Sequence, residues 1–355
     1  MAERTLMKGN EALAEAALRA GCKCFFGYPI TPQTEISAYL SKRMPKVGGV
    51  FLQAESEVAA INMVYGCAGS GIRCMTSSSS PGISLKSEGI SYIAGADLPC
   101  VIIDVMRGGP GLGGIQPSQA DYWQVTRGLG HGDYHCLVLA PASVQEMADT
   151  VTKAFDLADE YRMPAVVLAD GLLGQMMEPV EFDDAEIKMS TAENKPWAAN
   201  GHGNKRKHNI INSLYLQANE LEQTVVDRFK RYDDLKAKHT MAEASDCDDA
   251  DIVVVAYGST ARIAKSAVDA ARKKGIKAGM FRPITLWPFP EKEINAAVKN
   301  AKKVLTVEMS MGQMIEDVKL AINCSKPVEF FGRTGGVIPS PAEILAKIEE
   351  MEGTK

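Results

Sequence analysis

Short apolar runs that alternate with helical patterns most restrict what this chain can fold into. The runs have the length and composition of buried strands, and they lie at 24–27, 50–53, 73–76, 100–105, 136–139 and 165–168. Between them, apolar residues recur at helical spacing over 11–19, 56–68 and 144–161. Strands that are buried on both faces and joined by helices form a parallel sheet with helical crossovers. We therefore expect an α/β domain with a parallel sheet over residues 1–182.

Polar residues dominate the next segment, 183–250, where Asn, Lys, His and Glu are frequent and a charged helix is expected over 220–239. This composition indicates a polar linker or helical arm. The alternation then resumes, with a helix expected at 261–274 and strands at 252–256, 278–281, 304–307 and 328–331. The sequence therefore predicts a second, smaller α/β domain over residues 251–355.

The charge balance excludes two classes of partner. The formal net charge is -5, and lysine and arginine are spread along the chain, so we expect no nucleic-acid interface and no polybasic membrane anchor. The first ten residues are too polar for a secretory signal, and no apolar run has the length of a membrane span. We expect a cytoplasmic protein with no membrane contact.

The cysteines and histidines do not suggest a metal site. None of the eight cysteines stands in a C-x-x-C pair. Iron–sulfur and structural zinc sites favour thiolates at short spacings, which only Cys22 and Cys24 approach. His131 and His135 lie among glycines that indicate a loop. We expect no metal ligands on this chain.

Two motifs for nucleotides and nucleophiles are weak. Gly109, Gly111 and Gly114 formally satisfy G-x-G-x-x-G, but the last glycine is followed by Ile-Gln-Pro and does not begin a helix, as a dinucleotide site requires. The serine run at 77–80 has no G-x-S-x-G around it and indicates a polar turn. Since this turn follows a strand of a parallel sheet, its hydroxyls could still donate hydrogen bonds to a ligand.

Two further features lie at strand ends. Tyr28-Pro29-Ile30-Thr31-Pro32 follows the first expected strand, and its prolines fix a turn that presents the Thr31 hydroxyl at the edge of the sheet. Glu55 and Glu57 follow the next strand and begin a helix. From the pattern alone, the commoner role of these two acids is to favour the helix N-terminus through its dipole.

The motifs Y-P-I-T-P, Q-A-E-S-E-V-A-A, R-G-G-P-G and R-P-I-T-L-W-P-F-P occur in this order. Together they resemble the alpha subunit of 2-oxoacid:ferredoxin oxidoreductases over the whole chain. The match is greatest to the subunit of the branched-chain enzyme, 2-oxoisovalerate:ferredoxin oxidoreductase, through E-S-E-V at 55–58 and S-S-S-S-P-G at 77–82. The resemblance implies a pyrimidine-type thiamine-diphosphate-binding domain over 1–182 and a transketolase C-terminal-like domain over 251–355.

The resemblance also implies a division of labour between subunits. The family's diphosphate site carries a G-D-G motif and a paired asparagine, whereas this chain has only Asp170-Gly171, preceded by Ala169, and no Asn-Asn pair. The diphosphate and its Mg are therefore expected on a beta subunit, so that thiamine diphosphate is shared. Iron–sulfur clusters are expected on a ferredoxin-like partner subunit.

The matching motifs assign residues to the site. Glu57 corresponds to the glutamate that activates the cofactor at the pyrimidine N1′, and Glu55 is its nearest rival. Thr31 and Arg107 correspond to residues that bind the 2-oxoacid carboxylate, which an arginine can hold through two parallel hydrogen bonds. Further cofactor-binding residues implied by the match are Tyr28, Pro29 and Ile30.

The implied activity is oxidative decarboxylation of a 2-oxoacid to an acyl-CoA, with coenzyme A as acceptor and reduction of ferredoxin. A branched-chain substrate is expected, because Leu-Gly-Gly-Ile follows Gly111 where many 2-oxoglutarate relatives carry Thr-Gly-Leu-Pro-Thr. The alternatives are 2-oxoglutarate or pyruvate as substrate, or a non-catalytic scaffold that only binds a partner. Glu57 distinguishes these classes, because a scaffold has no use for a glutamate facing a ring pocket.

Overall fold

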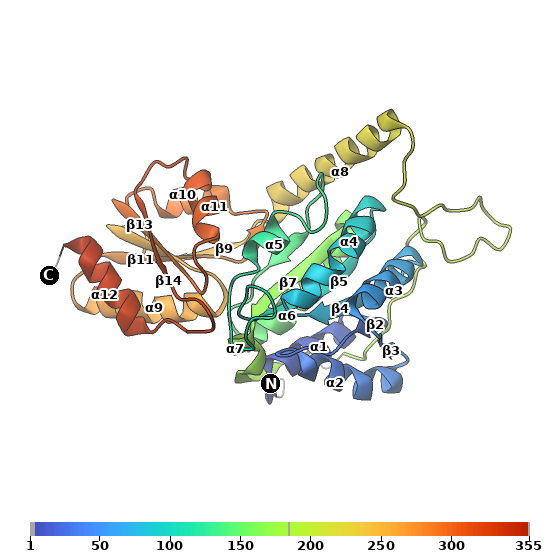
Figure 1. Cartoon of the computed structure of the whole chain (residues 1–355), viewed down its shortest axis with the longest axis horizontal. Coiled ribbons are helices and arrows are strands. Elements are labelled where there is room, and N and C mark those ends of the chain that lie inside the picture. The colour runs from blue at the N-terminus through green and yellow to red at the C-terminus, as the bar shows by residue number, and fades with distance from the viewer. Residues whose placement is uncertain (1–3, 184, 354–355) are drawn as a thin grey trace.

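The computed structural model describes residues 4–183 and 185–353. Figure 1 shows two α/β units with helix α8 (Ala218–His239) running from the N-terminal unit toward the C-terminal one. The predicted α/β fold class is confirmed, because both units are built on sheets of mainly parallel strands. Among the described residues, no helix is both long enough and apolar enough to cross a bilayer.

The N-terminal unit contains a seven-stranded sheet in the order β12-β6-β7-β5-β4-β2-β3. The strands predicted from the first six apolar runs are all present, two with the predicted bounds and four with bounds that differ by one or two residues. They are β2 (Cys24–Gly27), β3 (Val50–Gln53), β4 (Cys74–Ser78), β5 (Cys100–Met106), β6 (Leu137–Leu139) and β7 (Pro164–Asp170). All residues of the central strands β5 and β7 are buried, which explains why these strands appear in the sequence as continuous apolar runs.

Helices cover both faces of this sheet. Helix α1 packs on α6, and α3 packs on α4. Ser143 caps α6 and Ser56 caps α3. Each hydroxyl accepts a hydrogen bond from a backbone N–H in the first turn, which would otherwise have no partner within the helix. The bounds of the helices are α1 (Gly9–Arg19), α2 (Thr34–Arg43), α3 (Glu57–Gly69), α4 (Pro81–Gly95), α5 (Tyr122–Thr126), α6 (Val144–Tyr161) and α7 (Gly171–Gln175), with a 3-10 helix at Met44–Val47.

The C-terminal unit contains a five-stranded sheet in the order β14-β13-β10-β11-β9. Strand β9 (Ala242–Ser245) is antiparallel to its neighbour β11, and the others are parallel. The four predicted strands correspond to β10 (Ile252–Val255), β11 (Ala278–Pro283), β13 (Lys303–Glu308) and β14 (Val328–Gly332). Its helices are α9 (Gly258–Lys273), α10 (Glu291–Ala297), α11 (Met314–Ala321) and α12 (Pro341–Glu352).

Strand β12 (Thr285–Trp287) was not predicted. It pairs antiparallel with β6, so a segment that follows the first two parallel strands of the C-terminal unit completes the sheet of the N-terminal unit. A second small sheet, also not predicted, pairs β1 (Arg4–Lys8) with β8 (Met177–Glu181). These pairings join segments far apart in sequence, and we keep the division at residues 182 and 250 as a proposal about the chain's organisation.

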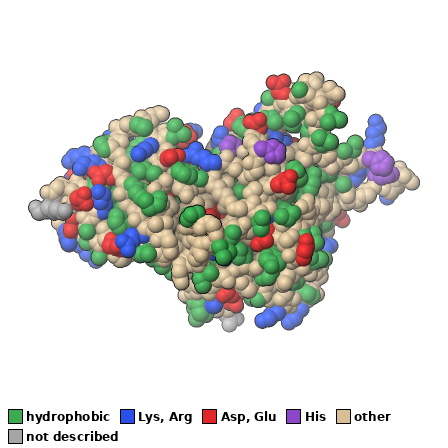
Figure 2. Space-filling view, viewed as in Figure 1, with side chains coloured by type: hydrophobic (Ala, Val, Ile, Leu, Met, Phe, Trp, Pro, Cys, Tyr) green, Lys and Arg blue, Asp and Glu red, His purple; other side chains and the backbone are tan. Residues whose placement is uncertain are grey.

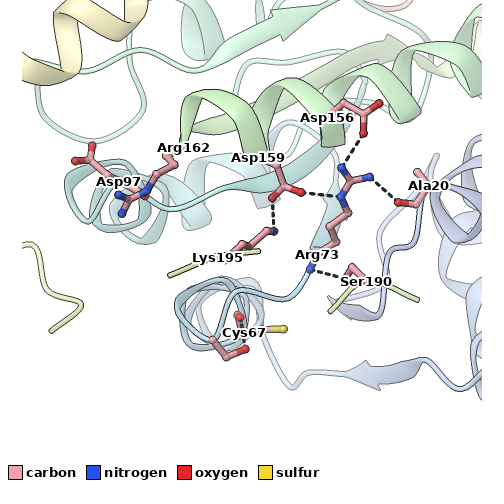
Figure 3. A network of polar contacts seen from close by, with 10 residues as sticks. Ala20, Cys67, Arg73, Asp97, Asp156, Asp159, Arg162, Ser190 and Lys195 are labelled. Atoms are coloured by element: carbon pink, nitrogen blue, oxygen red, sulfur yellow. Dashed lines mark hydrogen bonds and ion pairs between the residues drawn. The ribbon is translucent and has the colours of Figure 1, made fainter. Parts of the chain in front are cut away.

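The polar arm is attached to the N-terminal unit by ion pairs. The guanidinium of Arg73 donates to Asp156 at 2.7 Å and to Asp159 at 2.8 Å, and Asp159 also pairs with Lys195 of the arm (Figure 3). The Arg73 backbone N–H donates to the Ser190 hydroxyl at 2.8 Å. The charged helix predicted at 220–239 is confirmed as α8, while the irregular segment before it extends away from the sheet in Figure 1.

Charged side chains of both signs are interspersed on the face that Figure 2 displays. Arm residues contribute large apolar side chains to the surface, among them Ile210, Leu214 and Leu216, each at least 70% exposed. The surface charge follows the even distribution of lysine and arginine in the sequence.

Candidate active site

The residues predicted for the site lie on loops at one edge of the seven-stranded sheet. The carboxyl ends of β2, β3, β4 and β5 meet at this edge because these strands are parallel neighbours. Thr31 follows β2, Glu57 follows β3 and Arg107 follows β5. Ligands of open α/β sheets bind at such an edge.

Glu57 is the first residue of α3 and is 7% exposed, whereas Glu55 is exposed. The hydroxyl of Ser56 caps the helix by accepting a hydrogen bond from the Ala59 N–H at 3.2 Å, and it donates one to Glu55 at 3.3 Å. The turn thus directs Glu55 toward solvent and Glu57 into the protein. This difference supports the choice of Glu57 over Glu55, which the sequence pattern alone left open.

Gly82, in the first turn of α4, packs directly on Glu57. A Cβ at this position would lie 2.7 Å from Glu57 Oε1 and 2.0 Å from Ser78 Oγ, both closer than real Cβ contacts. Only glycine therefore fits here without displacing the carboxyl group. The glycine of S-S-S-S-P-G thus fixes where Glu57 lies.

Arg107 and Thr31 are brought together by their backbones. The Arg107 guanidinium donates from Nη1 to the Thr31 carbonyl at 3.0 Å and from Nη2 to the Leu112 carbonyl at 2.9 Å. Arg107 is 7% exposed, and its Nε has no hydrogen-bond partner among the described residues. A guanidinium has five N–H donors, so three remain for a ligand. Thr31 itself is an exposed residue of the turn.

Tyr28, Pro29 and Ile30 form the turn after β2, with Tyr28 37% exposed and the other two half-buried. The turn is held from below by Gln33, a fully buried residue that the sequence analysis missed. Gln33 donates to the Tyr28 carbonyl at 3.4 Å and accepts a hydrogen bond from Ser77 at 2.6 Å. The amide of Gln33 therefore links the turn after β2 to the end of β4.

The predicted serine run has divided roles. Ser77 binds Gln33, and Ser80 donates to Asp121 at 2.5 Å while accepting from the Arg107 N–H at 3.2 Å. Ser78 and Ser79 are buried, and their hydroxyls have no hydrogen-bond partner among the described residues. Buried hydroxyls are nearly always paired with protein, water or a ligand. These two can therefore still donate hydrogen bonds to a ligand, as the sequence suggested.

Asp104 and Asp121 form a buried acidic pair beside Ser80, and neither was among the predicted site residues. Burial and the charge of Asp121 raise the pKa of Asp104 well above its usual range. Burial raises the pKa of Asp121 to about 6, while the hydrogen bond from Ser80 and the charge of Arg107 oppose the rise. Burial therefore favours the protonated form of both carboxyl groups, and it does so more for Asp104 than for Asp121.

Asp170, the near match to the family's metal motif, is used by the protein itself. Its Oδ1 accepts from the N–H groups of Leu172 and Leu173 at 2.9 and 3.1 Å and so caps α7. Its Oδ2 accepts from the Ser259 hydroxyl at 2.6 Å, across to the start of α9. Over residues 4–183 and 185–353, no three His, Cys, Asp or Glu side chains converge in a way that could hold a metal ion.

A family model described as "Pyruvate flavodoxin/ferredoxin oxidoreductase, thiamine diP-bdg" matches residues 15–256, more than half of the chain. The chain belongs to the 2-oxoacid:ferredoxin oxidoreductase family. A second model, "Pyruvate:ferredoxin oxidoreductase core domain II", matches residues 250–344. The resemblance found from the motifs is confirmed, as is an oxidoreductase subunit with a thiamine-diphosphate-binding domain.

Two members of the family from Methanothermobacter marburgensis are similar to this chain over nearly their whole length. Ketoisovalerate oxidoreductase subunit VorB is 50% identical over 98% of each chain. The 2-oxoglutarate synthase subunit KorA of the same organism is 37% identical over 99% of this chain and 100% of its own. Identity is thus higher to the relative named for the branched-chain 2-oxoacid.

A solved structure of 2-oxoglutarate:ferredoxin oxidoreductase from Magnetococcus marinus, with 2-oxoglutarate, coenzyme A and succinyl-CoA bound, has the same fold with a TM-score of 0.85 at 26% identity. The superposition covers 98% of this chain but 65% of that one. This chain thus spans about two thirds of the length of that solved chain.

Proposed function

We propose that this family member is the alpha subunit of an oxidoreductase that converts a branched-chain 2-oxoacid, 2-oxoisovalerate, to its acyl-CoA and reduces ferredoxin. The observation that carries the substrate is the 50% identity to subunit VorB over 98% of both chains, against 37% to subunit KorA. The cytoplasmic location expected from the sequence stays part of this proposal.

The residues around Glu57 fit the pyrimidine end of thiamine diphosphate. Glu57 is a buried carboxyl at a sheet edge, and Gly82 holds it in place. Ser78 and Ser79 lie at the end of β4, and their hydroxyls have no hydrogen-bond partner in the described part of the chain. When bound, the cofactor supplies the carbon nucleophile that attacks the 2-oxo carbon. The Glu57 carboxyl group would carry a proton opposite the pyrimidine N1′ and would pass it to that nitrogen.

The part of Arg107 and Thr31 is to bind and orient the substrate carboxylate. The free N–H donors of Arg107 suit a carboxylate, because charge-assisted hydrogen bonds from a guanidinium are among the strongest in proteins. The turn of Tyr28, Pro29 and Ile30 lies next to Thr31 and would contact the cofactor from the β2 side. Holding substrate and cofactor in one orientation accounts for much of the rate that such a site can contribute.

The glycine-rich loop supports an apolar substrate side chain. Arg107 binds the Leu112 carbonyl, so this loop folds back over the guanidinium. Leu112 is 83% exposed and Ile115 is 57% exposed. The large side chains that this loop carries are apolar, which favours a branched hydrocarbon substrate over a dicarboxylate because they offer no partner for a second charge.

Partners complete the site in this proposal. A beta subunit would hold the diphosphate and Mg, and an iron–sulfur subunit would pass electrons to ferredoxin. Asp170 supports the location of the metal elsewhere, because its oxygens already accept hydrogen bonds from α7 and Ser259.

The test is co-expression of this chain with the other oxidoreductase subunits of its host, followed by assays of viologen reduction with a panel of 2-oxoacids and coenzyme A. We expect the highest kcat/KM with 2-oxoisovalerate. A higher value with 2-oxoglutarate or pyruvate would reassign the substrate. A stable, cofactor-loaded complex with no 2-oxoacid-dependent reduction would instead identify a non-catalytic scaffold.

A further inference from the structure

Lys86 is a lysine in α4 that is fully buried, and its ammonium group has no hydrogen-bond partner among the described residues. Transfer of an ammonium group from water into a protein interior is costly unless anions or other polar groups compensate. Lys86 does not belong to any motif that the family resemblance assigned, so its surroundings must explain why a lysine lies there.

Helix geometry places Lys86 between α3 and α4, behind Glu57. Gly82, Lys86 and Gly89 are spaced by four and three residues and so share one face of α4. Gly82 packs on Glu57, and a Cβ at Gly89 would lie 2.5 Å from Ile61 Cγ2, one turn further along α3. The face that carries Lys86 therefore meets the face of α3 that begins with Glu57. The two glycines let the helices approach closely enough to seal Lys86 from solvent.

The sheet beneath Lys86 also carries buried polar side chains without hydrogen-bond partners in the described part of the chain. Ser78 and Asp104 are register partners on β4 and β5, so their side chains share one face of the sheet. Neither Ser78 Oγ nor the two carboxyl oxygens of Asp104 have a hydrogen-bond partner among the described residues, and the same holds for Thr76 Oγ1. Buried polar atoms that have no hydrogen-bond partner in the protein are commonly bridged by ordered water. Lys86 is the cation of this buried polar group.

The charges that face Lys86 come from α3 and β5. Burial lowers the pKa of Lys86 to about 8, and the negative charges of Glu57 and Asp104 oppose the fall. Burial and the charge of Asp121 raise the pKa of Asp104 well above its usual range. Glu57 at the start of α3 and Asp104 on β5 are thus the two acidic groups that face Lys86.

We propose that Lys86 is a positioning residue that acts through Glu57: its charge stabilises the Glu57 carboxylate and so promotes transfer of the Glu57 proton to N1′ of thiamine diphosphate. This inference rests on the proposed role of Glu57. With the cofactor bound, the proton would leave the Glu57 carboxyl group and N1′ would gain it, while Lys86 would keep its own protons.

The test measures cofactor binding to the assembled complex in the absence of 2-oxoacid. The dissociation constant of thiamine diphosphate is compared with that of an analogue that has carbon in place of N1′, and the ratio isolates the contact at that nitrogen. We expect Lys86→Met to reduce the preference for the natural cofactor by about ten-fold, the equivalent of one pKa unit. Lys42→Met, at an exposed position in α2, should leave the ratio unchanged. A wild-type ratio in Lys86→Met would overturn the proposal.

The wild-type complex provides a second measurement that does not depend on the variant folding. Its preference for the natural cofactor should fall as the pH rises through about 8, where Lys86 loses its proton, and a constant preference across this range contradicts the proposal. Glu57→Gln separates the two hypotheses. If Glu57→Gln retains the wild-type preference, the role of Glu57 itself is wrong; if it loses the preference while Lys86→Met retains it, only the role of Lys86 fails.

Discussion

Arg107 Nη1 donates a 3.0 Å hydrogen bond to the backbone carbonyl of Thr31 and thereby joins the loops that follow β5 and β2. The contact uses the Thr31 backbone, so the Thr31 hydroxyl and the remaining guanidinium N–H groups stay available to a ligand. Arg107 is thus part of the loop structure as well as a candidate substrate-binding residue, and the two roles need separate tests.

Replacement of Arg107 should mainly weaken binding of the 2-oxoacid. Arg107→Ala removes a charge-assisted contact of about 1.5–3 kcal/mol, which corresponds to a KM for the 2-oxoacid raised roughly 10- to 100-fold. Thr31→Val keeps the backbone carbonyl and removes the hydroxyl alone, so a smaller rise is expected. Steady-state kinetics of viologen reduction check both variants. An unchanged KM in Arg107→Ala would move carboxylate binding to another residue.

Replacement of Glu57 should abolish turnover and leave assembly intact. Glu57→Gln keeps the size of the side chain but cannot pass a proton, so we expect a loss of at least about 100-fold in kcat, the usual contribution of a positioned acid or base. Glu55→Gln is the matched control, since Glu55 is exposed two residues away. Gel filtration of the complex checks assembly. Comparable losses in both variants would show that the assignment to Glu57 is wrong.

Gly82 should tolerate no side chain. In Gly82→Ala the new methyl group collides with Ser78 Oγ and Glu57 Oε1, and such overpacking costs about 1–3 kcal/mol. We expect a lower free energy of unfolding together with a loss of kcat, because Glu57 is displaced. Gly66→Ala in α3 is the control, since a Cβ there meets nothing within 4 Å. A fully active Gly82→Ala would show that the position of Glu57 is not critical.

Much of the fold followed from the sequence because its strands are buried on both faces. β5 and β7 are nearly continuous apolar runs, the pattern typical of strands that helices cover on both faces. β12 could not be foreseen, since Thr285–Trp287 pairs with a strand almost 150 residues earlier and nothing local specifies that partner. Helix α4 was also missed, because its serines and glycines mask the helical period.

The site was predicted less completely than the fold. Glu57, Thr31 and Arg107 were named through family motifs, and the structure places them at one sheet edge. Lys86 and Asp104 were missed for a physical reason: charged residues are rarely buried, so a sequence in which Lys86 stands between Leu85 and Ser87 gives no sign that its side chain lies in the interior. Their burial arises only when α4 packs on α3 and the sheet.

The acidic pair predicts a pH dependence of stability. Folding raises the pKa of Asp121 from 3.8 to about 6, so the folded protein binds a proton that the unfolded chain releases. The stability due to that proton is present below about pH 4 and is lost as the pH rises to about 6, by about 3 kcal/mol. Asp121→Asn cannot ionise and should flatten the Tm profile between these values and raise the Tm at pH 7. Asp233→Asn, at an exposed position in α8, should leave the profile unchanged. If Asp121→Asn shows the wild-type slope, folding does not raise the pKa of Asp121, and another group must account for the pH dependence.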